Sequence, residues 1–192
     1  TGLTTGTDNV AIGEAAGDAL TSGSDNTLVG DNAGGALTTG GNNVAIGSSA
    51  LLTEDGNGES VAVGFEALKV QNAGAAAYNV AVGYQAGAAV TTGILNTVTG
   101  GLAGDALTEG TRNVAIGKDA LTTDTLGSRS VAVGFAALYT QNFTTATDVY
   151  NVAVGEQAGL NVTTGNLNTL VGGLVGDAIT TGSANTSAGY GS

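Results

Sequence analysis

The stretch Asn9-Val-Ala-Ile-Gly13 returns along the chain as Asn43-Val-Ala-Ile-Gly47, as Ser60-Val-Ala-Val-Gly64 and in eight further variants. The glycines that end these eleven motifs lie 17 residues apart, except for one spacing of 19 and one of 21. Such a period indicates a repeat architecture in which each unit buries its apolar face against its neighbours. Val-Ala-Ile between Asn and Gly favours a β-strand. The sequence therefore predicts an all-β parallel β-solenoid of about eleven 17-residue coils, roughly 50 Å long at about 4.8 Å per coil.

The 17-residue repeats are themselves grouped into a longer repeat of four coils. Ser60 and Ser130 take the place of the motif Asn in the fourth copy of a set, and each copy precedes an insertion. We therefore interpret residues 1–192 as a single repeat domain with blocks 9–78, 79–150 and 151–192. The two insertions have matching flanks, so we expect two equivalent, protruding loops.

Within one coil the residue pattern predicts a strand, a turn at the motif Gly, a short second strand and a Gly-rich turn. The third residue after the motif Gly is nearly always Ala, as at Ala103 and Ala120, which predicts a column facing a space with little room. Where the middle strand residue grows to Leu28, the residue before it is the smaller Thr27. We interpret this as an exchange of volume between neighbouring columns.

Both faces of the predicted strand are apolar. Alternate strand residues face opposite sides, so Val10 and Ile12 share one face and Ala11 takes the other. A narrow coil buries only its inner face, and a solvated outer face would be polar. The pattern therefore predicts that further copies of the chain cover the outer face in a homotrimer. The alternative is a flattened coil that packs both faces within a monomer.

Composition excludes several classes of function. The net charge of −12 repels nucleic-acid phosphates and anionic lipids, so neither is an expected partner. The chain has no His and no Cys, and no paired carboxylates recur at one special place, so we do not expect an enzyme or a cofactor. No apolar stretch approaches the ~18 residues of a membrane span, so membrane insertion is not expected.

The motif resembles a known family. Asn-Val-Ala-Ile-Gly and Ser-Val-Ala-Val-Gly resemble the head repeats of trimeric autotransporter adhesins, and Gly83-Tyr-Gln-Ala-Gly87 is similar to repeats of phage tail-fibre proteins. The resemblance implies a left-handed parallel β-roll in a homotrimer that attaches to hosts or surfaces. The expected location is extracellular, on a cell surface, in a secreted filament or on a virion fibre.

Three functions follow from these patterns. The first is a structural fibre or filament module. The second is a receptor-binding adhesin in which the two insertion loops contact a surface glycan or a host receptor. The third is a calcium-binding or ice-binding solenoid, suggested by Gly-Asp pairs such as Gly104-Asp105 and by Thr pairs such as Thr38-Thr39. Adjacent Thr side chains cannot both face one plane, which disfavours ice binding.

Two groups of residues are candidate sites. The motif asparagines predict a structural ladder of stacked amides that hydrogen-bond one another: Asn9, Asn26, Asn43, Asn79, Asn96, Asn113, Asn151, Asn168 and Asn185. The aromatic residues around the insertions are candidates for recognition or for local capping of the loops: Phe65, Tyr78, Phe135, Tyr139, Phe143 and Tyr150.

The chain begins and stops within a coil, and the two half-coils are complementary. Neither end shows a polar cap, so we expect head-to-tail stacking of trimers into filaments. The alternative is that the chain is part of a longer fibre in which the missing half-coils are covalent.

Overall fold

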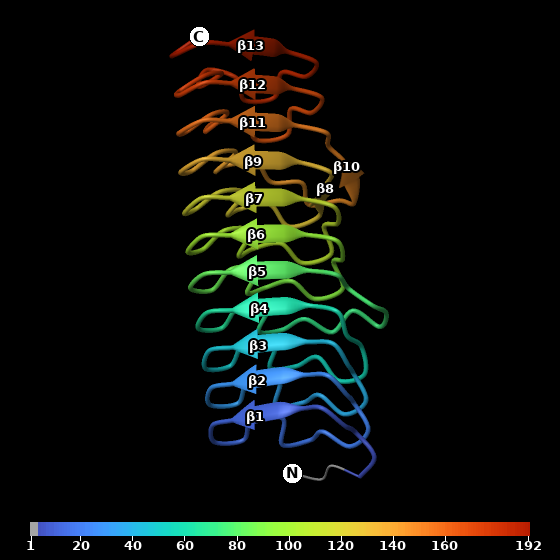
Figure 1. The fold of residues 1–192 in the computed structure, drawn as a ribbon. Coiled ribbons are helices and arrows are strands. Elements are labelled where there is room, and N and C mark those ends of the chain that lie inside the picture. The colour runs from blue at the N-terminus through green and yellow to red at the C-terminus, as the bar shows by residue number, and fades with distance from the viewer. Residues whose placement is uncertain (1–3) are drawn as a thin grey trace.

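The computed structural model describes residues 4–192 and shows one continuous stack of coils (Figure 1). Eleven strands, one from each coil, form a single sheet, and two further strands form a small separate sheet. The strands are β1 (Val10–Ile12), β2 (Thr27–Val29), β3 (Val44–Ile46), β4 (Val61–Val63), β5 (Val80–Val82), β6 (Thr97–Thr99), β7 (Val114–Ile116), β8 (Gly127–Ser128), β9 (Val131–Val133), β10 (Thr147–Asp148), β11 (Val152–Val154), β12 (Thr169–Val171) and β13 (Thr186–Ala188).

The stacking confirms the parallel β-solenoid of about eleven coils. Each main strand pairs in parallel with its counterparts in the coils before and after, so equivalent residues align along the stack. Ala62, for example, lies between Ala45 and Ala81. The described residues contain no helix, and hence none long and apolar enough to cross a membrane.

The prediction of a second strand in every coil is wrong. The main sheet takes three residues per coil, and within residues 4–192 only β8 and β10 form an additional pair, at the second insertion. The rest of each coil closes through turns whose backbone groups still bond to the next coil. The amide of Leu51, for example, donates to the carbonyl of Ala67 at 3.0 Å. Regular spacing between coils therefore does not require extended backbone on every side.

The motif glycines are required by the stacking itself. Gly117 has a φ of +132°, which side chains with a Cβ rarely adopt. A Cβ at this position would lie 2.3 Å from the carbonyl oxygen of Gly134 in the next coil. Backbone thus meets backbone at this corner, and no side chain fits between.

The core holds thin layers of small and branched side chains. The Ala column is buried, with Ala103 and Ala120 fully inaccessible. The sequence pattern predicts that the small Thr27 compensates for the large Leu28. Instead, the methyl groups of Leu28 fill the space beside Gly17 and Gly34. Glycine at that corner makes room for a large strand residue. In coils 3 and 4, Leu51 and Leu68 occupy the equivalent corner and are fully buried.

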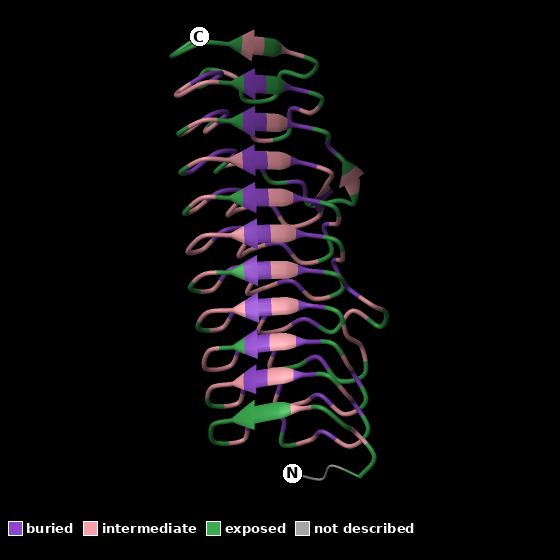
Figure 2. Ribbon diagram, viewed as in Figure 1, coloured by how far each residue is buried: buried purple, intermediate pink, exposed green. Residues whose placement is uncertain are grey.

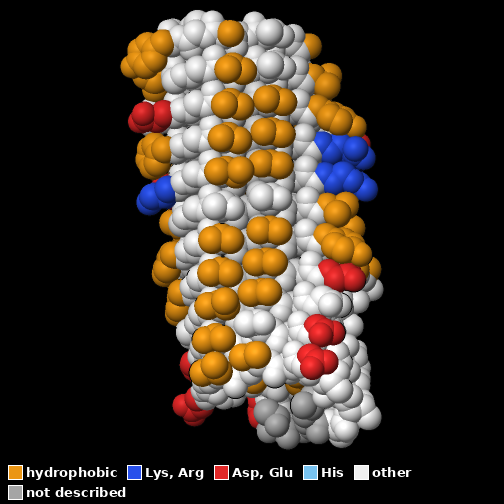
Figure 3. Space-filling view, viewed as in Figure 1, with side chains coloured by type: hydrophobic (Ala, Val, Ile, Leu, Met, Phe, Trp, Pro, Cys, Tyr) orange, Lys and Arg blue, Asp and Glu red, His pale blue; other side chains and the backbone are white. Residues whose placement is uncertain are grey.

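The two faces of the sheet differ in burial. Figure 2 shows the middle residue of nearly every main strand as buried, with intermediate or exposed residues on either side. The outer face carries the first and third strand residues, and Figure 3 shows them as two columns of mostly apolar side chains with breaks where Thr replaces Val or Ile. The alternative in which a flattened coil packs both faces within one chain therefore does not hold for residues 4–192.

Candidate functional site

The outer face of the sheet is a long, uncharged and mostly apolar part of the described surface. It consists of two columns, which run from Val10 and Ile12 to Thr186 and Ala188 and contain Val, Ile and Thr with a single Ala. Ile12 is 60% exposed, and Ile46, Val82, Ile116, Val154 and Val171 are also exposed. None of these positions carries a charge. An uncharged, regular and nearly flat apolar surface is suited to contact with another surface rather than to catalysis.

A row of residues borders this face on the side where the strands begin, and we call it the leading border. Its members directly precede the ladder position of each coil, and all have positive φ. They are Asp8, Asp25, Asn42, Glu59, Tyr78, Leu95, Arg112, Arg129, Tyr150, Leu167 and Ala184. The first four members are acidic apart from Asn42, Arg112 and Arg129 are basic, and the members between these groups and after them are apolar.

A second row borders the face where the strands end, and we call it the trailing border. Its members directly follow the motif Gly. They are Glu14, Asp31, Ser48, Phe65, Tyr84, Gly101, Lys118, Phe135, Glu156, Gly173 and Tyr190. The rings of Phe65 and Tyr84 stack in adjacent coils, with centroids 5.5 Å apart and planes within 13°. The ammonium group of Lys118 lies 5.7 Å from the ring centroid of Phe135.

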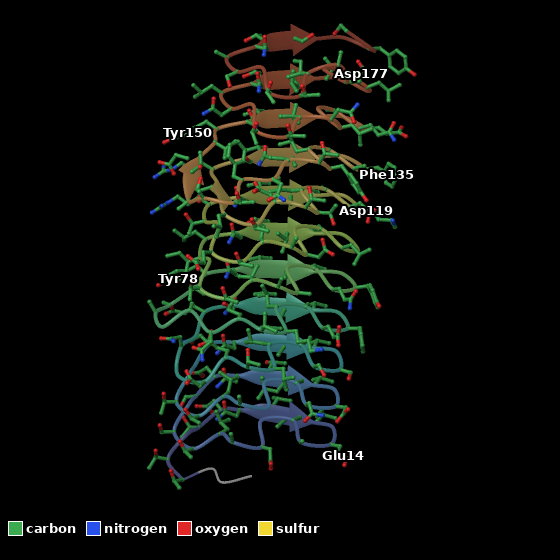
Figure 4. The ribbon with its side chains drawn as sticks, turned by 180° about the vertical axis from the view of Figure 1, so that it is seen from behind. Glu14, Tyr78, Asp119, Phe135, Tyr150 and Asp177 are labelled. Carbon is green, nitrogen blue, oxygen red and sulfur yellow. The ribbon has the colours of Figure 1, made fainter. Side chains whose placement is uncertain are left out.

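The candidate aromatic residues do not form one group. Tyr78 and Tyr150 lie on the leading border, whereas Phe135 lies at the opposite border, as the rear view in Figure 4 shows. Phe65 occupies the same trailing border. Tyr139 is exposed elsewhere on the coil. A main strand lies between the two borders of each coil, so residues that are close in sequence lie on opposite sides of the sheet.

Phe143 is not available for recognition, because it is buried to 8% exposure. Its amide donates to the carboxylate of Asp124 at 2.9 Å, and its carbonyl accepts from the amide of Leu126 at 2.9 Å. The two insertions also differ from each other. The second contains β10, which pairs with β8, whereas the first contains no strand.

The asparagine column lies inside the coil and bonds mainly to backbone. In Asn96 the side-chain oxygen accepts from the amide of Asn113 at 2.9 Å, and Nδ2 donates to the carbonyl of Gly110 at 2.8 Å. Among the ladder residues of the described chain, one asparagine side chain bonds directly to another only near the two ends, from Asn26 to Asn9 and from Asn185 to Asn168. The ladder therefore holds the turn of the next coil in place and offers no free group to a ligand.

Two buried polar clusters interrupt the apolar core, one beside each insertion, and sequence reasoning missed them. In the first, Gln71 donates to Glu54 and to Ser60, at 3.1 Å each, and accepts from Asn79 at 2.8 Å. In the second, Gln141 donates to Asp124 at 2.5 Å and to Ser130 at 3.0 Å, and accepts from Asn151 at 2.8 Å. The signal was present in the sequence, because the residue seven positions after the motif Gly is polar only in these coils.

The carboxylates in the two clusters accept several hydrogen bonds. Asp124 accepts from the amides of Gly127 and Phe143 as well as from Gln141. Burial nevertheless raises the pKa of Asp124 above the ordinary range, and these hydrogen bonds oppose the rise. No buried side-chain polar atom in residues 4–192 lacks a partner. Both clusters are therefore complete without a ligand.

The calcium hypothesis gains no support from side-chain placement. Asp18, Asp105 and Asp177 follow the motif Gly by five residues, whereas Asp31 follows it by one, so the Gly-Asp pairs do not form one column. Asp105 accepts a hydrogen bond from Thr122. Within the described part of the chain, no three acidic side chains are grouped to hold a metal ion, and the surface contains no pocket.

Comparison with protein-family models, with curated proteins and with solved structures finds no match to this chain.

Proposed function

We propose that this chain is a structural module of an extracellular fibre of the phage tail-fibre or adhesin type, whose copies associate as a homotrimer through the outer face of the sheet. The observation that supports this proposal is a face of two uncharged, mostly apolar columns along the sheet, whose residues are exposed or only partly buried. Each coil fills its interior with the middle strand residue and the Ala column, so the outer columns have no partner within the chain.

The energetics favour covering this face. Burial of apolar surface contributes roughly 25 cal/mol per Å², and monomeric proteins rarely expose a continuous apolar patch of more than a few hundred Å². The exposed columns extend over eleven coils. Three copies around a common axis is the arrangement that the resemblance to trimeric adhesin repeats implies.

The fold also suits a load-bearing shaft. Every coil bonds to the next through the strand ladder, the turns and the asparagine column. The shape is set by repetition and not by one central core, so coils can be added without changing the contacts within them.

Mass measurement by light scattering tests the proposal. We expect a particle of three times the 18.3 kDa chain mass, at micromolar concentration. The double substitution Val82→Asp and Ile116→Asp places charge on the outer face and should give a folded monomer. Thr92→Asp is the matched control, because Thr92 is exposed and lies outside the sheet. A wild-type monomer under these conditions would contradict the proposal.

Receptor binding by the insertion loops is a second candidate. The loops after β4 and after β9 project beyond the regular coils on one side of the stack (Figure 1). Shortening residues 72–77 and 142–149 to the length of a regular corner, with Tyr78 and Tyr150 kept, separates the two functions. Assembly should survive in either case. Binding to cells or to a glycan array should disappear only if the loops recognise a ligand.

A further inference from the structure

The exposed apolar residues gather on one side of the solenoid. Sixteen large apolar side chains are exposed in residues 4–192, and all except Tyr139 lie on the outer face or on its two borders. The leading border contributes Tyr78, Leu95, Tyr150 and Leu167, and the trailing border contributes Phe65, Tyr84, Phe135 and Tyr190. The apolar surface is therefore wider than the sheet, and the flat face alone does not account for it.

We propose that the trailing border of one copy packs against the leading border of the next copy at the same coil. The inference rests on the proposed homotrimer and states how its subunits meet. The partner is a second copy of this chain, oriented in the same direction. The contact adds to the outer face and sets the register between subunits.

Symmetry supports this pairing. Rotation about an axis parallel to the solenoid carries each coil to the same height in the next copy. The three sheet faces then turn toward the axis, and the end of a strand in one copy lies beside the start of the equivalent strand in its neighbour. Such an interface is heterologous, so unlike borders meet.

Side chains at matching heights are complementary in two places. Beside β5, Tyr84 on one border faces Tyr78 on the other, with Phe65 and Leu95 one coil away on either side. Beside β9, Phe135 faces Arg129. Arg129 already lies 5.4 Å from the ring of Tyr150, so its guanidinium group is placed near aromatic rings. Large apolar residues of both borders therefore coincide beside β5, and an aromatic ring meets a guanidinium group beside β9.

Backbone strain points to the same border. Tyr78, Leu95, Tyr150 and Leu167 all have φ between +51° and +63°. Bulky residues rarely adopt this conformation, whereas Asn adopts it more readily. Asn42 occupies the equivalent position in coil 3. Leu95 and Leu167 combine this backbone conformation with exposure of a large apolar side chain, and a neighbouring copy would bury that surface.

Cysteine cross-linking tests the register, and the natural chain has no Cys to interfere. The matched variant is Tyr78→Cys with Tyr84→Cys. Strand β5 separates these positions within one chain, well beyond the ~7 Å between Cα atoms that a disulfide spans. The mismatched control is Tyr78→Cys with Phe135→Cys, which lie three coils apart, about 14 Å at ~4.8 Å per coil. Oxidation and a short bis-maleimide are applied to both variants, and the products are separated on a denaturing gel.

We expect the matched variant to yield covalent trimers and the control to yield none. A matched variant that stays uncross-linked with both reagents, while light scattering still shows a trimer, would overturn the border contact and leave the proposed function standing. Covalent dimers from a Phe65→Cys, Phe135→Cys variant would overturn it in favour of an antiparallel pair in which like borders meet. Monomers throughout would instead refute the proposed homotrimer.

Discussion

Ser60 occupies a position where most coils have a ladder asparagine, and the side-chain amide of Gln71 takes the place of the missing asparagine amide. Its Nε2 donates to the Ser60 hydroxyl at 3.1 Å, and its oxygen accepts from Asn79 at 2.8 Å, so the buried polar column continues past the first insertion. Gln141 and Ser130 repeat the arrangement at the second insertion. Each Ser and the Gln that follows it therefore act together, and they keep the polar column continuous in a coil that carries a longer loop.

Replacing Gln71 with Leu should destabilise the chain. The change leaves buried Glu54 without its Gln71 donor, and an unsatisfied buried polar group costs about 1–3 kcal/mol. Urea unfolding of Gln71→Leu measures the loss. Gln157→Leu is the control, because Gln157 is only half-buried. Equal stability of the two variants would show that the cluster is energetically unimportant.

Gly117→Ala should be severely destabilising. The substitution forces a Cβ against the Gly134 carbonyl and into a φ of +132°, so we expect a loss of more than about 3 kcal/mol or failure to fold. Gly101→Ala is the matched control, because the nearest atom to its added Cβ is 4.0 Å away and its φ is not in the positive region. Melting temperatures by circular dichroism give the comparison. A Gly117→Ala protein as stable as Gly101→Ala would contradict the close stacking.

Stability should depend on the protonation of Asp124. Burial raises its pKa in the folded state, so the folded protein binds this proton more tightly than the unfolded chain does. The resulting contribution to stability is present below the unfolded pKa of about 3.9 and is lost as pH rises through the folded pKa. Relative to wild type, Asp124→Asn should therefore become more stable as pH rises across this window. Unfolding free energies of both proteins at several pH values measure the difference, and a constant difference would exclude the effect.

Association of the copies should strengthen with salt. In the proposed register, Asp25 faces Asp31, Asp8 faces Glu14, and Arg112 faces Lys118. Screening of these like-charge pairs is substantial above about 0.1 M salt, where the Debye length is about 10 Å. Asp25→Lys should tighten the trimer by removing one repulsion. Asp18→Lys, an equal charge change outside the borders, should do so less. Sedimentation equilibrium at low and high salt provides the dissociation constants, and weakening by salt would indicate an antiparallel pair instead.

Periodicity was enough to predict the fold but not the local backbone. The spacing of motif glycines fixes one strand per coil and their alignment, which the pairing of Ala62 with Ala45 and Ala81 confirms. The residue types at the remaining corners favour a second strand, because nothing in them marks Leu51 or Leu68 as left-handed. Those two residues adopt positive φ because full burial of their side chains compensates for the strain.

The candidate sites were harder to predict, for a geometric reason. Phe135 and Tyr150 are near in sequence, yet the coil carries them to opposite borders of the sheet. The outer apolar columns followed directly from strand alternation, since Val and Ile flank Ala. The borders could not be identified in the same way, because each is a row of residues 17 or more apart and its character emerges only when coils are stacked.

The parallel ladder also determines how the rod responds to pulling. Backbone bonds between coils point along the long axis, so tension on the two ends loads the outermost ladder first and peels it away before the next carries force. Each release frees one coil of about 17 residues as slack chain. A single chain would therefore yield by stepwise unzipping, whereas side-by-side copies would share the load across several ladders at once.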